Sequence, residues 1–236
     1  MAQIARRLVL PGVAAIGLLA LAKRQARRKT AEAPQTEGRV LRAARWYDLF
    51  GTLISFGRDK AIRQQLISIA TPAPGEKVLD VGCGTGTLAL ALDSRVGTGE
   101  IYGIDASPEM IEVARKKATQ SGATIDFQVA LIEAIPFPDA TFDLVTSSLM
   151  LHHLPDDLKR RGLAEIRRVL KLDGRFVAVD FAAQGHGPLG HLLAIFGHAR
   201  GERMADKLRP LLGAAGFSNV EVIPTRHKNF TFLRAR

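Results

Sequence analysis

The sequence predicts an α/β protein with a doubly wound, mainly parallel sheet of seven strands. From Lys77 onward, short apolar runs alternate with amphipathic runs, as in proteins whose strands alternate with helices. The first apolar run leads into a glycine-rich turn at 82–86, and two further strand patterns follow the last helix. A length of 236 residues suits one such domain with an appendage.

The elements follow one another in a regular order. We expect helices at 58–70, 87–93, 108–120, 156–170 and 202–215, and strands at 77–81, 100–104, 124–129, 142–147, 175–180, 219–223 and 227–233. Ser107 should cap the third helix, which Pro108 begins, and Gly216 should end the last one. Residues 171–174 should form a turn into the fifth strand.

The charge of the chain is concentrated near its beginning. There are 33 Lys and Arg residues against 23 Asp and Glu, a net charge of +10, but residues 1–31 hold seven of the basic residues and no acid. Without these seven, 26 basic residues face 23 acidic ones, a net charge of +3. We therefore expect no nucleic-acid partner. The single cysteine, Cys83, excludes an intrachain disulfide, and no metal site is expected.

An uncharged, mostly apolar run occupies residues 8–22 and has basic residues on both sides. As a helix its 15 residues would span about 22 Å at ~1.5 Å per residue, less than the ~30 Å of a hydrocarbon core. Three interpretations stay open: a membrane anchor or interfacial helix, a secretory signal peptide, and an organelle transit peptide. We divide the chain into this anchor or targeting helix (1–29), a linker (30–39), a helical cap (40–76) and the α/β domain (77–236).

The glycine turn carries the chemical information. It reads G-x-G-x-G, which is neither the G-x-G-x-x-G of dinucleotide binders nor a P-loop. Asp80 precedes it, and Asp105 follows the second strand, where a carboxylate can accept two hydrogen bonds from ribose hydroxyls. An acid near the loop would repel a pyrophosphate but suits a cationic ligand. Either aspartate could instead only cap the helix that follows it.

Five blocks in order extend this pattern: VLDVGCGTG at 78–86, GIDASPEMIEVARKKA at 103–118, IEAIPFPDATFDLVTSSLMLHHL at 132–154, IRRVLKLDGRFVAVDF at 166–181 and LLGAAGFSNVEVI at 211–223. With them the chain resembles the class I S-adenosylmethionine (SAM)-dependent methyltransferases, which have a Rossmann-like fold. Within that class it looks most like the ubiquinone/menaquinone-biosynthesis methyltransferases and the related bacterial phospholipid N-methyltransferases.

The resemblance implies that SAM is the cofactor. Asp80, Gly82 and Gly84 would line its methionine portion, Asp105 would bind the ribose, and Ser148 would lie near the amino-acid end. Leu131 stands where relatives often carry Asp or Asn to hold the adenine amine. The implied cofactor-binding residues are Asp80, Gly82, Cys83, Gly84, Gly86, Asp105, Ala106, Met110, Leu131, Ile132 and Ser148.

Three histidines are candidates for a general base, which is needed only where the acceptor must lose a proton. They are His152 and His153, after the fourth strand, and His186. The alternative for the first two is a structural turn ahead of Pro155. A zinc site from His186 and the histidines after it is disfavoured, because no cysteine or acidic cluster accompanies them.

The resulting hypothesis is methyl transfer to a small or lipid-like acceptor, either a quinone precursor or a phospholipid amine. The basic, apolar segment 1–29 would hold the enzyme at a membrane surface, with the catalytic domain in the cytoplasm or, alternatively, in an organelle matrix. Two other functions stay open. One is a catalytically silent membrane-bound protein of the same fold. The other is a dinucleotide-binding oxidoreductase, which would need one more residue before the third glycine.

Overall fold

The computed structural model describes residues 36, 58–182, 204–227 and 229–236. The predicted anchor (1–29), the linker other than Thr36, the cap before residue 58, and His186 all lie outside these ranges. Within them, no helix combines the length and the apolar composition that crossing a bilayer requires. The N-terminal apolar helix therefore stays a prediction, as do the domain boundaries drawn around it.

A single seven-stranded sheet forms the centre of the described protein, in the order β3-β2-β1-β4-β5-β7-β6. The first five strands run parallel, while β7 lies antiparallel between β5 and β6. The strands are β1 (Lys77–Val81), β2 (Glu100–Asp105), β3 (Ile125–Val129), β4 (Phe142–Ser148), β5 (Leu170–Phe181), β6 (Val220–Ile223) and β7 (Phe230–Ala235). The strand order reverses between β1 and β4, so a ligand is expected at the carboxyl ends of these strands.

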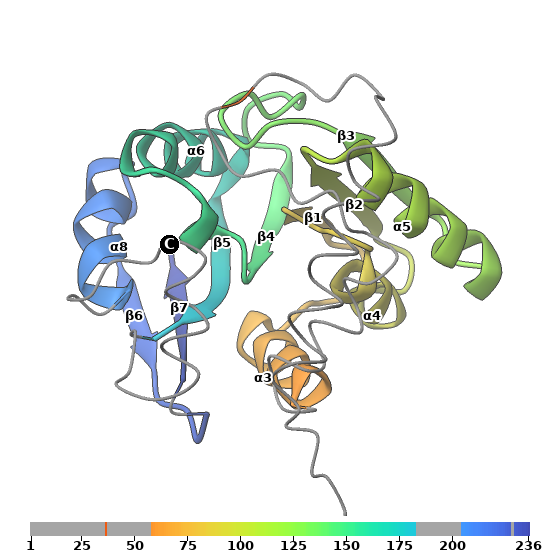
Figure 1. Ribbon diagram of the computed structural model, residues 1–236, viewed down its shortest axis with the longest axis horizontal. Coiled ribbons are helices and arrows are strands. Elements are labelled where there is room, and N and C mark those ends of the chain that lie inside the picture. The colour runs from red at the N-terminus through yellow and green to blue at the C-terminus, as the bar shows by residue number, and fades with distance from the viewer. Residues whose placement is uncertain (1–35, 37–57, 183–203, 228) are drawn as a thin grey trace, which may run out of the picture.

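Helices cover both faces of the sheet, which confirms the doubly wound arrangement (Figure 1). One core cluster joins the sheet to α3, α4 and α5 through residues such as Leu66, Leu92 and Ile111. The other joins it to α6 and α8 through residues such as Ile166 and Leu208. The helices are α3 (Asp59–Ala70), α4 (Thr87–Val96), α5 (Pro108–Ser121), α6 (Asp156–Val169) and α8 (Met204–Ala214), with a short 3-10 turn, η1 (Leu151–His153).

The start of α5 follows from its local sequence. Pro108 occupies the first helical turn, and the Ser107 hydroxyl accepts a hydrogen bond from the Met110 backbone N–H at 3.3 Å. The cap satisfies a donor that the helix itself leaves unpaired, and the fixed φ of proline favours the helical conformation that follows. The predicted helix start is confirmed.

The turn predicted at 171–174 is wrong. The strand β5 already begins at Leu170, which pairs with Phe142, and pairing resumes at Arg175 opposite Leu144. The surplus residues form a bulge that leaves the Leu172 side chain 88% exposed. Residues 171–174 are mostly polar and include a glycine, as turns often do. Here, however, buried residues of β5 pair with β4 both before and after this segment, which keeps it in the sheet.

Arg175, at the end of this bulge, fixes α3 to the sheet. Its side chain is buried and makes a bidentate ion pair with Glu76, with both N–O distances at 2.8 Å. It also donates to the backbone carbonyls of Ala70 and Thr71, at the end of α3. One guanidinium thereby satisfies a carboxylate and two helix-end carbonyls.

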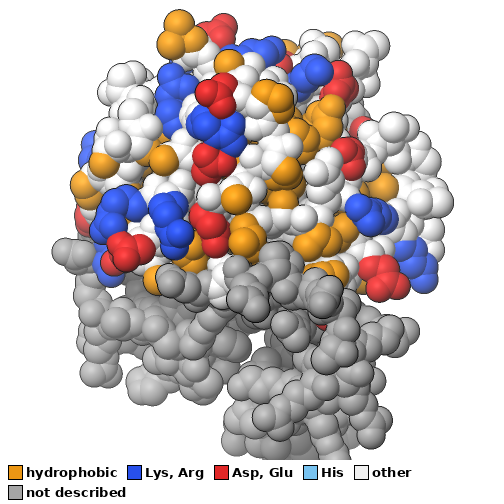
Figure 2. Space-filling view, turned by 90° about the horizontal axis from the view of Figure 1, so that it is seen from above, with side chains coloured by type: hydrophobic (Ala, Val, Ile, Leu, Met, Phe, Trp, Pro, Cys, Tyr) orange, Lys and Arg blue, Asp and Glu red, His pale blue; other side chains and the backbone are white. Residues whose placement is uncertain are grey.

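Charges of both signs are interspersed on the upper face of the molecule. Figure 2, seen from above the view of Figure 1, shows Lys and Arg beside Asp and Glu, with apolar side chains between them. The described part of this face therefore has no continuous basic surface. That pattern agrees with the small net charge left once the N-terminal basic residues are set aside.

Candidate active site

The glycine turn opens a space at the carboxyl end of β1. Gly82, Gly84 and Gly86 all have positive φ, at 69°, 53° and 76°. A Cβ on Gly82 would lie 2.3 Å from the Cγ of Met150, so a larger residue there would displace a side chain that lines the cavity. Because α4 begins directly after the turn, its unpaired N–H groups face the same region.

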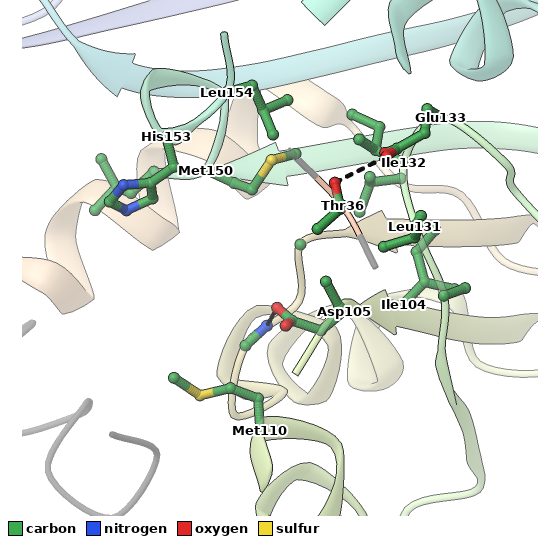
Figure 3. A pocket seen from close by; sticks show the side chains of 16 residues that line it. Thr36, Ile104, Asp105, Met110, Leu131, Ile132, Glu133, Met150, His153 and Leu154 are labelled. Carbon is green, nitrogen blue, oxygen red and sulfur yellow. Dashed lines mark hydrogen bonds between the residues drawn. The ribbon is translucent and has the colours of Figure 1, made fainter. Parts of the chain in front are cut away.

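Asp105 closes β2 beside this turn. Its Oδ2 accepts a hydrogen bond from Gly84 N at 2.9 Å (Figure 3). Its Oδ1 accepts one from Ser107 N at 2.8 Å. Burial raises the pKa of Asp105, and the two backbone N–H groups oppose that rise. Each carboxylate oxygen has two lone pairs, so both oxygens can still accept a hydroxyl from a ribose.

Asp80 lies at the end of β1 and is almost completely buried, with 1% of its surface exposed. Its Oδ1 accepts a hydrogen bond from the Thr146 hydroxyl at 2.8 Å. Burial raises the pKa of Asp80 to about 7, and the hydrogen bond from Thr146 only partly offsets this. A cationic ligand nearby would favour the ionised form, so this position suits a sulfonium or an ammonium group.

Two cavities meet at the glycine turn and share Gly82, Gly84 and Leu149. Of the predicted cofactor residues, the first cavity is also lined by Asp105, Ala106, Met110, Leu131 and Ile132. The second is lined by Asp80, Cys83 and Ser148, and reaches α3 and α4. The sequence-predicted residues thus divide between two adjoining cavities. We call the first the nucleoside cavity, because it holds the residues predicted to contact the ribose and the adenine.

Two residues of the predicted set contribute to packing. Gly86 lines neither cavity, and a Cβ there would lie 2.7 Å from Phe127 and 2.9 Å from Ala114. Cys83 is buried, which raises the pKa of its thiol and keeps it protonated. This agrees with the expectation that Cys83 packs and is not a nucleophile.

His152 forms a buried pair with Asp180, a residue that the sequence interpretation missed. The Nδ1 of His152 lies 2.6 Å from Asp180 Oδ1, and both side chains are at most 5% exposed. Asp180 Oδ2 also accepts from the His152 backbone N–H at 2.9 Å. Burial opposes ionisation of Asp180, but the facing histidine and the backbone donors hold its pKa below the ordinary value.

His153 lines the nucleoside cavity, and its ring centroid lies 3.8 Å from that of His152. Of the three predicted histidines, the structure therefore places His153 in the lining of a cavity and His152 directly behind it, lining neither cavity, while His186 is outside the described ranges. Asp180 lies one residue before the end of β5, as Asp80 lies one residue before the end of β1, and Asp105 is the last residue of β2. The rule that ligand-binding residues lie at the carboxyl ends of parallel strands would therefore have pointed to Asp180 as well. Within the described residues, no group of three or more His, Cys, Asp or Glu side chains could hold a metal ion.

The fold and this site define a doubly wound α/β protein with two cavities beside a glycine turn, each lined by an acid from the end of a central strand. Comparison with known proteins identifies the class. A family model described as "Methyltransferase domain" matches residues 78–174. The YcgJ protein from Bacillus subtilis is 33% identical, with a TM-score of 0.59 over 69% of this chain and 70% of that one. A SAM-dependent methyltransferase from Aquifex aeolicus, 23% identical, shares the fold with a TM-score of 0.65 over 81% and 95% of the two chains.

Curated relatives point the same way. The chain is 35% identical over 150 residues to a demethylmenaquinone methyltransferase of Thermus thermophilus, covering 64% of this chain and 67% of that protein. It is 39% identical over 139 residues to the ubiquinone/menaquinone biosynthesis C-methyltransferase UbiE of Geotalea uraniireducens, covering 58% of each. The chain therefore belongs to the SAM-dependent methyltransferases, and SAM is its cofactor. It spans between 55% and 67% of the length of the curated relatives that it matches.

Proposed function

We propose that this methyltransferase transfers a methyl group from SAM to a ring carbon of a quinone precursor. The observation that carries the proposal is the identity to demethylmenaquinone and ubiquinone/menaquinone C-methyltransferases over the part of the chain that holds the site. The site geometry supports it, because the acids at the ends of β1 and β2 lie beside a glycine turn that leaves room for a nucleoside. Because the chain belongs to the SAM-dependent methyltransferases, the alternative function of a dinucleotide-binding oxidoreductase no longer applies.

In this proposal the cavity residues hold the cofactor in a fixed orientation. Asp105 binds the ribose hydroxyls, Ala106 and Met110 flank the adenine, and Asp80 faces the cationic amino-acid end. When bound, SAM supplies a methyl group from its sulfonium, and the sulfur keeps the electron pair of the broken C–S bond. The burial of Asp80 keeps water from screening the charge that it presents to the ligand. Much of the rate acceleration then comes from positioning the acceptor against the methyl group.

His152 and Asp180 supply the base in this proposal. A ring carbon of a phenolic acceptor becomes nucleophilic when its hydroxyl loses a proton, and the ring carbon itself loses a proton after the new C–C bond forms. With Nδ1–H donated to Asp180, the His152 ring presents Nε2 as its proton acceptor, and the buried carboxylate holds the ring in this tautomer and orientation. The simpler alternative is that Asp180 only fixes the η1 turn through the His152 backbone N–H.

The pH profile separates these two roles. His152→Gln and Asp180→Asn should each lower kcat with little effect on SAM binding, and should change the acid limb of the kcat profile. His227→Gln, at a histidine that is not paired with Asp180, is the matched control. If the two variants keep the parental kcat and pH profile, the base assignment is wrong, whatever happens to their stability.

The acceptor is tested with the full chain, methyl-labelled SAM and lipid extracts. Label recovered in a quinone precursor on carbon supports the proposal. Label recovered in a phospholipid amine would replace it with the second acceptor class that the sequence left open. Tight binding of SAM without label transfer to any lipid would favour the catalytically silent alternative.

We also propose that residues 1–29 hold the enzyme at a membrane surface, with the catalytic domain in the cytoplasm. The support is the uncharged 15-residue run at 8–22 with basic residues on both sides, together with the lipid-soluble acceptor of the main proposal. The full chain should float with anionic vesicles in a density gradient, and a variant lacking 1–29 should not. Equal flotation of the two proteins would contradict the anchor, and fractionation that places the protein in an organelle matrix would contradict the cytoplasmic location.

A further inference from the structure

We infer that the Glu133 carboxylate accepts a hydrogen bond from the exocyclic amine of the cofactor's adenine and thereby sets the base specificity of the site. The inference rests on the proposed function, because it assigns a role within the same cofactor cavity. It concerns a residue that neither the glycine turn nor the strand-end acids would indicate, since Glu133 lies in the segment after β3.

The lining of the nucleoside cavity contains two carboxylates among the described residues, Asp105 and Glu133. In Figure 3 they lie apart, with Thr36 between them. Asp105 is already placed to meet the ribose. The side chains beside Glu133, Leu131 and Ile132, are aliphatic and can accept no hydrogen bond. Of the three neighbouring side chains, only that of Glu133 can therefore accept an amine N–H and offset the loss of its hydration.

Thr36 shows that Glu133 can receive a donor from within the cavity. The Thr36 hydroxyl, which also lines the cavity, donates to Glu133 Oε1 at 2.8 Å. This bond uses one of about four acceptor positions that a carboxylate offers, so Oε2 can accept an amine N–H at the same time. The carboxylate is half-buried, so a hydrogen bond to it is less exposed to competition from water.

The backbone on both sides of Glu133 is held in place, which favours a specific contact over an adaptable one. Ile132 is buried so closely against α6 that a Cβ on Gly162 would lie 2.7 Å from it. The Ile135 N–H donates to the Glu165 side chain at 3.0 Å, and Ala134 N–H donates to Leu131 O at 3.2 Å. A side chain on such a fixed segment loses little further freedom when it binds.

The test compares two ligands that differ at one edge of the base. S-adenosylhomocysteine carries the exocyclic amine beside an unprotonated N1, whereas S-inosylhomocysteine has a carbonyl oxygen in place of the amine and a hydrogen on N1. At the position of the amine, the inosyl ligand therefore has no proton to donate to the carboxylate. Calorimetry with the full-length protein should show that the parent prefers the adenosyl ligand. Glu133→Ala should weaken adenosyl binding by about ten- to a hundredfold, as expected for a hydrogen bond to a charged group, and should leave inosyl binding unchanged or improved.

Two further variants make the result specific. Glu133→Gln keeps the size of the side chain and offers both a donor and an acceptor. It should therefore reduce the ratio of the affinities for the adenosyl and inosyl ligands. Glu112→Gln removes an exposed carboxylate of α5 outside the cavity and should keep the parental preference. Thermal melting of each variant shows whether it is folded. If Glu133→Ala does not fold, the affinities of Glu133→Gln are compared with those of the parent instead.

The outcomes separate this inference from the proposed function. If Glu133→Ala or Glu133→Gln is folded and keeps the parental ratio of the two affinities, the assignment of Glu133 is overturned, while cofactor binding stands. If the parent itself binds neither ligand, the proposed function fails together with the inference.

Discussion

Replacing Asp80 with asparagine should make the protein more stable, and increasingly so as the pH rises. The carboxyl is buried at the end of β1, where burial raises its pKa to about 7. An acid whose pKa is higher in the folded state than in the unfolded state destabilises the fold at every pH above its pKa in the unfolded state. Asparagine cannot ionise, yet its carbonyl can still accept the hydrogen bond from Thr146.

The size of the effect follows from the two pKa values. Below the ordinary aspartate pKa of 3.8, both states are protonated and the Asp80 carboxyl does not lower the free energy of unfolding. Between 3.8 and about 7 the unfolded state is ionised while the folded state is neutral, so the cost grows with pH; above about 7 it is constant. At 1.36 kcal/mol per pKa unit, the cost is about 2 kcal/mol at pH 5 and about 4 kcal/mol at pH 8.

Urea unfolding of the ligand-free protein at pH 5, 6, 7 and 8 measures this cost as the difference between Asp80→Asn and the parent. Asp173→Asn, at an exposed carboxylate in the β5 bulge, is the control and should show no such trend. The same Asp80 variant should bind SAM more weakly, because the charge that destabilises the fold also attracts the cationic ligand. A stability difference that stays constant from pH 5 to pH 8 would refute the reasoning.

Three further substitutions test other contacts. Asp105→Ala should weaken binding of S-adenosylhomocysteine by about tenfold or more in calorimetry, and an unchanged affinity would disprove the ribose assignment. Arg175→Ala should lower the free energy of unfolding by about 3–5 kcal/mol, because it leaves a buried carboxylate and two carbonyls without their donor; a loss below about 1 kcal/mol would contradict this. Gly86→Ala should lower the free energy of unfolding by about 1–3 kcal/mol more than Gly122→Ala does. The two glycines have similar φ, but only a Cβ at position 86 would clash with Phe127. Equal losses of stability in the two variants would exclude this clash.

Features that depend on neighbouring residues could be predicted from the sequence. The Ser107 cap needs only the three residues that follow it, and the structure has it as expected. The place of Asp80 and Asp105 at the same edge of the sheet, close enough for their charges to interact, also followed from the sequence, because the carboxyl ends of parallel strands lie at one edge. Both inferences use a geometry that every helix start or parallel sheet repeats.

Features that depend on distant segments could not be predicted. The bulge before Arg175 exists because β5 pairs with β4, 28 positions or more away, and no local pattern reports that pairing. The contact between Thr36 and Glu133 joins residues 97 positions apart. Asp180 is different, since its place at a strand end was visible, but the partner that gives it a role is His152, on another element.

The place of β7 in the sheet has a consequence for biosynthesis. Of the described strands, β7 is the last in the sequence and so leaves the ribosome after the others, yet it lies between β5 and β6 and provides the only pairing that β6 has among them. A nascent chain that has not yet exposed Phe230–Ala235 therefore presents β5 with a bare edge, which can pair with another chain. Translation that stops just before Phe230 should therefore yield aggregates.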